Sequence, residues 1–217
     1  MTPAVSDTST QTVFVVDDDP SVLKALARLL TQGGWTVETY ESAESFLARL
    51  EPQRPGCLVL DVDLPGLDGI ELQRRQAEAG QRLPIVFLTG RGDIPMSVRA
   101  IKAGAVDFLT KPVVSEALFH AIRAGFEQDA AARSADLETA EIRQRFETLT
   151  PRECEVLAGL VAGRLNKQIA GDLGIVEQTV KFHRARIMER MQARTVAELM
   201  HIAARLGVEV QPRYPKG

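Results

Sequence analysis

Five short apolar runs alternate with helical patterns along the first half of the chain, and this alternation constrains the fold more than any other feature. The runs lie at residues 13–16, 35–40, 58–60, 85–88 and 106–109. Amphipathic patterns separate them at residues 20–32, 43–50, 69–79 and 95–103. Short, continuously apolar runs are typical of strands that helices cover on both faces of a parallel sheet. The pattern therefore predicts a doubly wound α/β domain over residues 12–126, whose ligands bind at the carboxyl ends of the strands.

The segment after this domain has a helical composition. Residues 115–147 contain no proline and only one glycine, Gly125. Apolar side chains recur there at roughly helical spacing: Leu118, Ile122, Phe126, Leu137, Ile142 and Phe146. We expect the last helix of the α/β domain to run into a helical linker, residues 127–148, with a break near Gly125 or Ser134 as an alternative. The apolar residues do not form a clean heptad, which favours a spacer over a coiled coil with a second chain.

The C-terminal segment predicts a second domain. Thr150, Pro151 and Glu153 form a helix start: a capping threonine, a proline at the first helical position and a glutamate that completes the cap. Amphipathic patterns follow at residues 151–162, 167–173, 177–191 and 195–206. Four short helices predict a compact all-α domain over residues 149–208. Residues 1–11 and 209–217 are expected to be tails, the first of them disordered.

Charge is distributed unevenly among these segments. Residues 1–126 carry 12 basic and 16 acidic residues, residues 127–148 carry 3 and 6, and residues 149–217 carry 11 and 7. A basic C-terminal domain favours a polyanionic partner, although ordinary surface variation produces similar differences. Two distant cysteines, Cys57 and Cys154, and the lack of an apolar run of membrane-spanning length predict a cytoplasmic protein without a membrane partner.

Polar residues gather where the predicted strands end. They are Asp17, Asp18 and Asp19 after the first strand, Asp61 after the third, Thr89 after the fourth and Lys111-Pro112 after the fifth. Because the carboxyl ends of parallel strands share one edge of a sheet, these residues should converge. Clustered carboxylates with open positions suit Mg²⁺, and a carboxylate beside that ion can attack phosphorus and form an aspartyl phosphate. Alternatively, the three consecutive aspartates only cap the following helix, the role expected of Asp19.

Four motifs together resemble the receiver domain of two-component response regulators. They are "VVDDDPSV", "VLDVDLPGLDG", "FLTGRGD" and "DFLTKP", and the match covers residues 12–126. The resemblance implies a flavodoxin-like fold and a set of functional residues. These are Asp61 as phosphoacceptor; Asp17, Asp18, Asp61 and the backbone carbonyl of Asp63 as Mg²⁺ ligands; Thr89 and Lys111 as phosphoryl-binding groups; Thr89 and Phe108 as switch residues; and a cis Lys111–Pro112 peptide bond.

The predicted helix at residues 177–191 has an unusual outer face. At 100° per residue, Ile187 and Met191 lie on the same inward side as Val180. The opposite side carries Gln178, Phe182, Ala185 and Glu189. An outward phenylalanine either packs against the linker or the other domain, or enters a DNA major groove, where its ring contacts a thymine methyl group.

The segment "LTPRECEVLAGLVAGRLNKQIAGDLGIVEQTVKFHRARIM" resembles the LuxR/FixJ/NarL-type helix-turn-helix, over residues 149–206. The resemblance makes "NKQIA" part of the supporting helix and "VEQTVKFHRARIM" the recognition helix. The expected DNA contacts are Asn166, Lys167, Gln178, Thr179, Lys181, Phe182, Arg184 and Arg186. Two positions depart from the family pattern: Val176 replaces a capping residue, and Phe182 replaces a small aliphatic one. His183 lies on the inward flank and is expected to pack.

The stretch "GRGDIPMSVRAIKAGAVDF" is most similar to the FixJ branch, which implies dimerisation around Val98, Lys102 and Asp107. Together the resemblances imply a transcription regulator and not an enzyme. A sensor histidine kinase would phosphorylate Asp61, and the resulting homodimer would bind double-stranded promoter DNA and act with RNA polymerase.

Two other functions and one further pairing stay open. The "DVD" of residues 61–63 is similar to the nucleophile and general acid of haloacid-dehalogenase-type phosphatases, a reading that leaves Asp17 and Asp18 unexplained. A DNA-binding protein that does not depend on phosphorylation is the other alternative. In addition, Asp63 and Arg91 have opposite charges and stand two residues after Asp61 and Thr89, respectively. In receivers these positions flank the path of the water that attacks the aspartyl phosphate, so an ion pair between Asp63 and Arg91 would change the lifetime of that phosphate.

Overall fold

The computed structural model describes residues 11–51, 54–90 and 94–207 of the chain. It consists of two compact units, one ending at Arg133 and the other beginning at Ser134. The strands of the first unit are β1 (Thr12–Val16), β2 (Thr36–Tyr40), β3 (Gly56–Asp61), β4 (Ile85–Thr89) and β5 (Asp107–Thr110). All neighbouring strands are parallel, in the order β2-β1-β3-β4-β5, which confirms the predicted doubly wound sheet.

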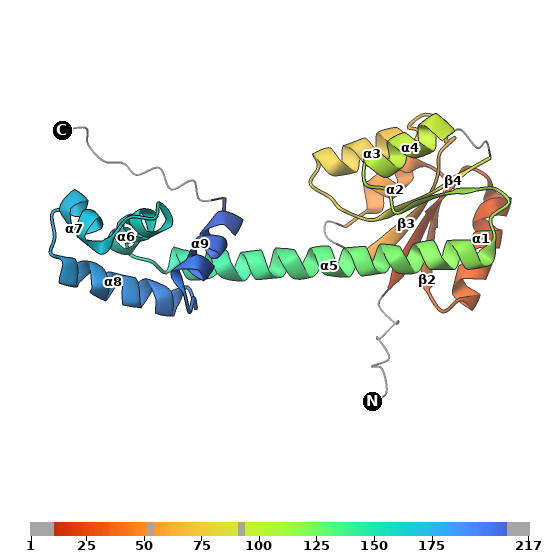
Figure 1. Cartoon of the computed structure of the whole chain (residues 1–217). Coiled ribbons are helices and arrows are strands. Elements are labelled where there is room, and N and C mark those ends of the chain that lie inside the picture. The colour runs from red at the N-terminus through yellow and green to blue at the C-terminus, as the bar shows by residue number, and fades with distance from the viewer. Residues whose placement is uncertain (1–10, 52–53, 91–93, 208–217) are drawn as a thin grey trace. The chain divides into compact units, whose positions relative to one another are not determined.

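Helices cover both faces of this sheet (Figure 1). They are α1 (Pro20–Gln32), α2 (Ala43–Arg49), α3 (Gly69–Glu78), α4 (Ile94–Lys102) and the first part of α5 (Ser115–Glu147). Because side chains alternate along a strand, each strand supplies two cores. Phe14, Leu58 and Phe87 pack toward α2, α3 and α4. Val13 and Val59 pack on the other face, toward α1 and α5.

Helix α5 is continuous, so the alternative of a break near Gly125 or Ser134 is wrong. Gly125 is buried against Cys57, where an added Cβ would lie 2.7 Å from the Cys57 sulfur. Within the first unit, Phe126 belongs to the core. Within the second unit, Ile142 is buried. The predicted linker is therefore helical, but its last turns are part of the C-terminal core and not a free spacer.

The second unit contains α6 (Pro151–Val161), α7 (Asn166–Leu173), α8 (Glu177–Arg190) and α9 (Val196–Arg205) around one core. Its first helix starts as predicted, because the Thr150 hydroxyl accepts from the Glu153 N–H and the Glu153 carboxylate accepts from the Thr150 N–H. Gly174 ends α7 with a φ of 63°, a left-handed conformation that favours glycine. Val176 precedes α8 without any side-chain cap, as predicted.

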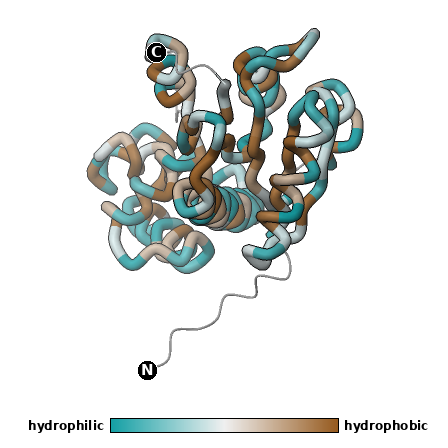
Figure 2. Tube along the Cα trace, turned by 90° about the vertical axis from the view of Figure 1, so that its right-hand side faces the viewer, coloured by the Kyte–Doolittle hydropathy of each residue, from teal (hydrophilic) through white to brown (hydrophobic). Residues whose placement is uncertain are grey.

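The helices of both units carry polar as well as apolar residues. Figure 2 shows hydrophobic and hydrophilic residues interspersed along the helices. Among the described helices, including the long α5, none combines the length and the hydropathy that a membrane span requires.

Candidate functional site

Three carboxylates meet at the carboxyl edge of the sheet. Asp17 and Asp18 follow β1 and Asp61 ends β3, and one oxygen atom of each lies within 4.8 Å of the others. Lys111, directly after β5, bridges two of them. Its Nζ lies 2.6 Å from Asp17 Oδ2 and 3.2 Å from Asp61 Oδ2. The structure thus brings together residues that are separated by up to 94 positions in the sequence, as the strand-end pattern predicts.

Asp61 is a buried carboxylate with incomplete hydrogen bonding. Asp61 is 5 % exposed and Asp17 is 1 % exposed, whereas Asp18 is exposed. Burial raises the pKa of the Asp61 carboxyl, the Lys111 charge lowers it, and the Asp17 charge raises it again, so that the pKa lies above its ordinary value. Asp61 Oδ1 is buried and accepts no hydrogen bond from the described residues. A buried oxygen without a partner is costly, and an additional positive group would relieve that cost.

The acidic cluster fits a hard divalent cation. It offers only oxygen ligands, as Mg²⁺ prefers. Asp61 Oδ1, which has no hydrogen-bond partner among the described residues, is available to bind a cation. Lys111 neutralises only part of the charge of the three carboxylates. The donor set therefore agrees with a metal held by Asp17, Asp18 and Asp61.

Asp19 has a different role from the two aspartates before it. Its Oδ1 accepts from the Ser21 N–H at 2.7 Å and caps α1, which confirms that part of the capping interpretation. The Asp19 N–H in turn donates to Asp17 Oδ1 at 3.0 Å. This backbone hydrogen bond holds Asp17 Oδ1, while Asp17 Oδ2 pairs with Lys111.

The predicted switch residues lie on β4 and β5, the two strands that follow β3 in the sheet. Thr89 ends β4 and is 1 % exposed, and its carbonyl accepts from the Lys111 N–H at 2.7 Å. Phe108 lies half-buried on β5, with its ring centroid 6.0 Å from that of Phe87. The Lys111–Pro112 peptide bond is cis, as the resemblance implies.

Two residues that the sequence patterns did not single out support the loop after Asp61. Gly69 begins α3, and a Cβ at this position would lie 2.6 Å from the Asp61 carbonyl oxygen. Glu44 of α2 accepts from the Leu67 N–H through Oε1 at 3.3 Å. The Asp-Gly pair at the start of α3 was the only available signal for Gly69, whereas no local pattern points to Glu44.

Asp63 differs from Asp61 in its surroundings. Its side chain is exposed, while its backbone N–H helps to lower the pKa of Asp61. The expected role of its carbonyl as a metal ligand stays a prediction. Arg91, the expected partner of the Asp63 side chain, lies outside the described residues.

The predicted dimerisation face carries exposed apolar side chains. Val98 and Ile101 of α4 are 46 % and 45 % exposed, and Lys102 is also exposed. Asp107 is half-buried, and its Oδ1 accepts from the Phe108 N–H at 2.8 Å. Ile101 was not among the predicted residues, although its position three residues after Val98 places it on the same side of a helix. An exposed apolar pair of this kind is typical of an interaction surface.

The predicted DNA contacts lie at the start of α7 and along α8. Val180 and Ile187 are fully buried and Met191 nearly so, which confirms the inward side predicted for α8. The remaining residues are exposed or half-buried: Asn166, Lys167, Gln178, Thr179, Lys181, Phe182, Arg184 and Arg186. Lys181 also pairs with Glu177 at 3.1 Å, an exposed ion pair of small energetic weight.

Phe182 is exposed and is held by a neighbouring cation. The side chain is 56 % exposed, and the Arg186 guanidinium carbon lies 5.0 Å from the ring centroid. His183 beside it is half-buried, and its Nδ1 makes no hydrogen bond with the described residues. Within its own unit, Phe182 is therefore not a core residue.

Comparison with known proteins assigns both units to families. Residues 13–123 match the family described as response regulator receiver domain. Residues 147–203 match the family described as bacterial regulatory proteins, luxR family. The two matches cover the acidic cluster and the helices α6 to α8, respectively.

Several relatives match this chain across most of its length. Nodulation protein W of Bradyrhizobium diazoefficiens is 44% identical over 196 residues, which cover 90% of this chain and 86% of the relative. The transcriptional regulatory protein FixJ of Rhizobium meliloti is 44% identical over 193 residues, covering 88% and 94%. Among solved structures, the response regulator StyR is 47% identical with a TM-score of 0.75, covering 91% of this chain and 100% of that chain. This chain therefore belongs to the two-component response regulators that join a receiver domain to a LuxR-type DNA-binding domain, as FixJ does.

Proposed function

We propose that this protein is phosphorylated on Asp61 by a sensor histidine kinase, dimerises, and binds promoter DNA to regulate transcription. The observation that carries the proposal is the cluster of Asp17, Asp18, Asp61 and Lys111 on a chain that also has an exposed helix-turn-helix. The protein acts as a cytoplasmic regulator and not as an enzyme, with RNA polymerase as a further partner.

The residues divide the chemistry among themselves. An Asp61 carboxylate oxygen attacks the phosphorus of the donor, and the bond from phosphorus to the leaving group breaks with its electron pair. Lys111, already 3.2 Å from Asp61, binds a phosphoryl oxygen. Asp17 and Asp18, with the Asp63 carbonyl, would hold Mg²⁺, which neutralises charge on the transferring group when bound.

The consequence for DNA binding runs through α4 and β5. Thr89 and Phe108 would respond to the new phosphoryl group, and the exposed Val98 and Ile101 would then pair with a second copy. A two-fold dimer presents two recognition helices, so the DNA site should contain two related half-sites in roughly palindromic order. Gln178, Lys181 and Phe182 would contact bases, while Lys167 and Arg184 would contact phosphates.

The first experiment treats the full chain with acetyl phosphate and Mg²⁺ and measures intact mass. We expect the wild-type protein and Asp136→Asn, an exposed aspartate in the second unit, to gain one phosphoryl group each. Asp61→Asn should gain none. Equal labelling of Asp61→Asn would overturn the assignment of the phosphoacceptor.

Further measurements separate the two remaining alternatives. Sustained hydrolysis of a free phosphomonoester that requires the Asp63 carboxyl would support a phosphatase. A DNA affinity and a molecular mass in solution that do not change on phosphorylation would support a phosphorylation-independent DNA binder. On the proposed function, Ile101→Asp should reduce dimerisation without reducing the labelling of Asp61, because Ile101 lies on the exposed side of α4.

A further inference from the structure

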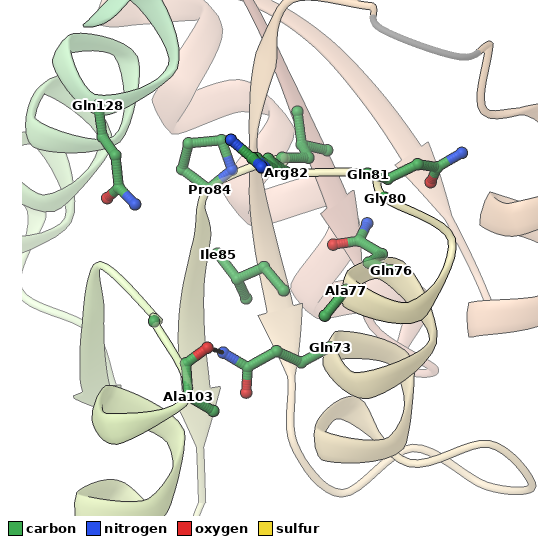
Figure 3. Close-up of a pocket in the computed structure, with 12 residues that line it drawn as sticks. Gln73, Gln76, Ala77, Gly80, Gln81, Arg82, Pro84, Ile85, Ala103 and Gln128 are labelled. Atoms are coloured by element: carbon green, nitrogen blue, oxygen red, sulfur yellow. Dashed lines mark hydrogen bonds between the residues drawn. The ribbon is translucent and has the colours of Figure 1, made fainter. Parts of the chain in front are cut away.

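The C-terminal end of α4 is held by a side chain of helix α3. Gln73 of α3 donates through Nε2 to the carbonyl oxygens of Ala100 and Ala103, both at 3.3 Å. Figure 3 shows the bond to Ala103. Carbonyls at the end of a helix lack partners within that helix, so a donor from outside satisfies them. Gln73 therefore acts as a cap for α4 that another helix supplies.

The bond from Gln73 to Ala100 is shielded from water. Gln73 is 7 % exposed, and Ala100 is fully buried. Such a bond is costly to break, because no water replaces the lost partner. The Ala100 carbonyl also accepts from the Ala105 N–H at 3.1 Å, in the turn that leads to β5. The end of α4 is thus held by α3 on one side and by its own turn on the other.

Helix α3 is also fixed to the end of β3. Gly69 lies one turn before Gln73, so the two residues share one side of the helix. The Gly69 N–H donates to the Val62 carbonyl at 3.2 Å, and a Cβ on Gly69 would lie 2.6 Å from the Asp61 carbonyl oxygen. The first turn of α3 therefore contacts the strand end that carries Asp61, and its second turn contacts the end of α4.

The anchored part of α4 carries the exposed apolar pair, Val98 and Ile101. Ile101 lies in sequence between Ala100 and Ala103, the two residues whose carbonyls Gln73 binds. A helix whose end is already ordered loses less conformational freedom when a second copy binds to it. The bonds from Gln73 should therefore favour association at this face.

We propose that Gln73 is a positioning residue for dimerisation, which holds α4 in the orientation that allows Val98 and Ile101 to pair with a second copy. This inference rests on the proposed function, in which phosphorylation of Asp61 leads to dimerisation through α4. Gln73 makes its bonds at the end of α4 and not in the acidic cluster. Loss of its amide should therefore weaken the dimer and leave the phosphorylation of Asp61 unchanged.

Gln73→Met tests the inference, because methionine has a similar length but no hydrogen-bond donor. Gln76→Met is the matched control. Gln76 is also a buried glutamine of α3 and lines the same cavity (Figure 3), but its Nε2 makes no hydrogen bond with the described residues. A general effect of replacing a buried glutamine would appear in both variants, whereas an effect through α4 would appear only in Gln73→Met.

Each full-length protein is treated with acetyl phosphate and Mg²⁺, and its monomer–dimer equilibrium is measured by analytical ultracentrifugation. We expect the wild type and both variants to gain one phosphoryl group at the same rate. The dimer dissociation constant should rise about tenfold in Gln73→Met, as expected for the loss of one or two neutral hydrogen bonds, and stay unchanged in Gln76→Met. Without phosphorylation, the amides of Gly104 and Ala105 should exchange faster in Gln73→Met alone.

The outcomes separate this inference from the proposed function. A wild-type protein that gains no phosphoryl group, or that stays monomeric afterwards, contradicts the proposed function and this inference with it. If the wild type dimerises, an equal or lower dissociation constant for Gln73→Met shows that Gln73 does not position α4 for dimerisation. An equal rise in both variants also contradicts the inference, because it indicates a general effect on α3.

A measurement on the wild-type protein does not depend on how well either variant folds. If the bonds from Gln73 favour the dimer, dimerisation must in turn stabilise those bonds, because coupling between two equilibria is reciprocal. NMR should therefore show that the side-chain NH₂ protons of Gln73 exchange with water more slowly in the phosphorylated dimer than in the monomer. Unchanged or faster exchange in the dimer would count against the proposal.

Discussion

Each unit buries a carboxylate, Asp61 in the first and Glu153 in the second, and the two differ in their hydrogen bonds and in the direction of their pKa shifts. Glu153 is 1 % exposed, and its Oε2 accepts from the Thr150 N–H at 2.8 Å and from the Thr150 hydroxyl at 2.9 Å, with Arg190 Nη1 3.5 Å away. Asp61 is 5 % exposed but keeps Oδ1 unpaired among the described residues. The Thr150 N–H holds the pKa of Glu153 below its ordinary value, whereas burial raises that of Asp61.

The difference shows what each carboxylate is for. A buried carboxylate whose pKa is lowered by its hydrogen bonds stabilises the folded state, because its charged form is better bonded there than in the unfolded chain. A buried carboxylate that is incompletely bonded stays available for a cation or for attack on phosphorus. Burial alone therefore does not distinguish a structural carboxylate from a reactive one, but the set of partners does.

The largest expected effect comes from Lys111→Ala. This change leaves the buried Asp17 and Asp61 facing each other without their shared cation, and it removes the group that would bind the phosphoryl oxygen. We expect the rate of labelling by acetyl phosphate to fall about 100-fold, a typical loss for one charge-stabilising group. The measurement is the initial rate of mass increase at fixed Mg²⁺.

Lys24→Ala is the matched control, because Lys24 is an exposed lysine on α1. It should label at the wild-type rate. If Lys111→Ala also gained phosphoryl groups at the wild-type rate, the reactivity of Asp61 would not depend on the Lys111 cation. The proposed chemical difference between Asp61 and Glu153 would then be contradicted.

The second prediction concerns Glu153→Ala, which should destabilise the second unit by about 2 kcal/mol through the loss of the cap and its bonds. Because the folded-state pKa of Glu153 is lowered, the charged carboxylate contributes stability above the unfolded pKa of 4.5. That contribution is lost as the pH falls through the folded-state pKa. Hydrogen exchange of the α6 amides should therefore show a difference between variant and wild type at pH 7 that shrinks in acid.

Glu155→Ala is the control for this change. Its carboxylate is half exposed and pairs with Arg152 on the surface, so its removal should shift stability by less than about 0.5 kcal/mol. Equal effects of the two substitutions would show that Glu153 is no better bonded than a surface residue.

The acidic cluster was predictable to a large extent because its position depends on strand ends. The carboxyl ends of parallel strands must converge, so Asp17, Asp61 and Lys111 could be placed together without coordinates. Gly69 and Glu44 were missed because they act through a backbone carbonyl and a backbone N–H, and neither contact leaves a pattern in the sequence. The continuity of α5 was equally undetermined, since the close packing of Gly125 on Cys57 leaves no room for a larger residue and is not visible in the sequence.

The third prediction compares two helical glycines, one in each unit. In Gly69→Ala the new Cβ would lie 2.6 Å from the Asp61 carbonyl oxygen, so the backbone must shift. We expect a destabilisation of about 1 kcal/mol or more. Trp35, the single tryptophan, is buried in the first unit and reports its unfolding by fluorescence.

Gly171→Ala is the opposite case. Apart from its chain neighbours and the backbone of α7 itself, no atom of the described residues lies within 4 Å of an added Cβ at this position, so alanine should stabilise that helix by up to about 1 kcal/mol through its higher helix propensity. A destabilising Gly171→Ala would imply a close neighbour that the structure does not show. A neutral Gly69→Ala would mean that the loop after Asp61 can shift freely.

The smallest effect on stability is expected from Phe182→Ala, which removes an exposed apolar side chain and not a buried charge. With 56 % of its side chain exposed, Phe182 contributes little to folding, so Phe182→Ala should leave the stability of the second unit nearly unchanged. DNA affinity should fall about fivefold, as expected for the loss of one apolar contact with a base. Lys167→Ala should instead weaken binding to all DNA sequences alike. It should also reduce the slope of log affinity against log salt concentration by about one. Binding isotherms at several salt concentrations separate the two behaviours. A Phe182→Ala variant that binds its selected DNA as tightly as the wild type would place the ring outside the interface, and a variant that unfolds would make it a packing residue like Val180.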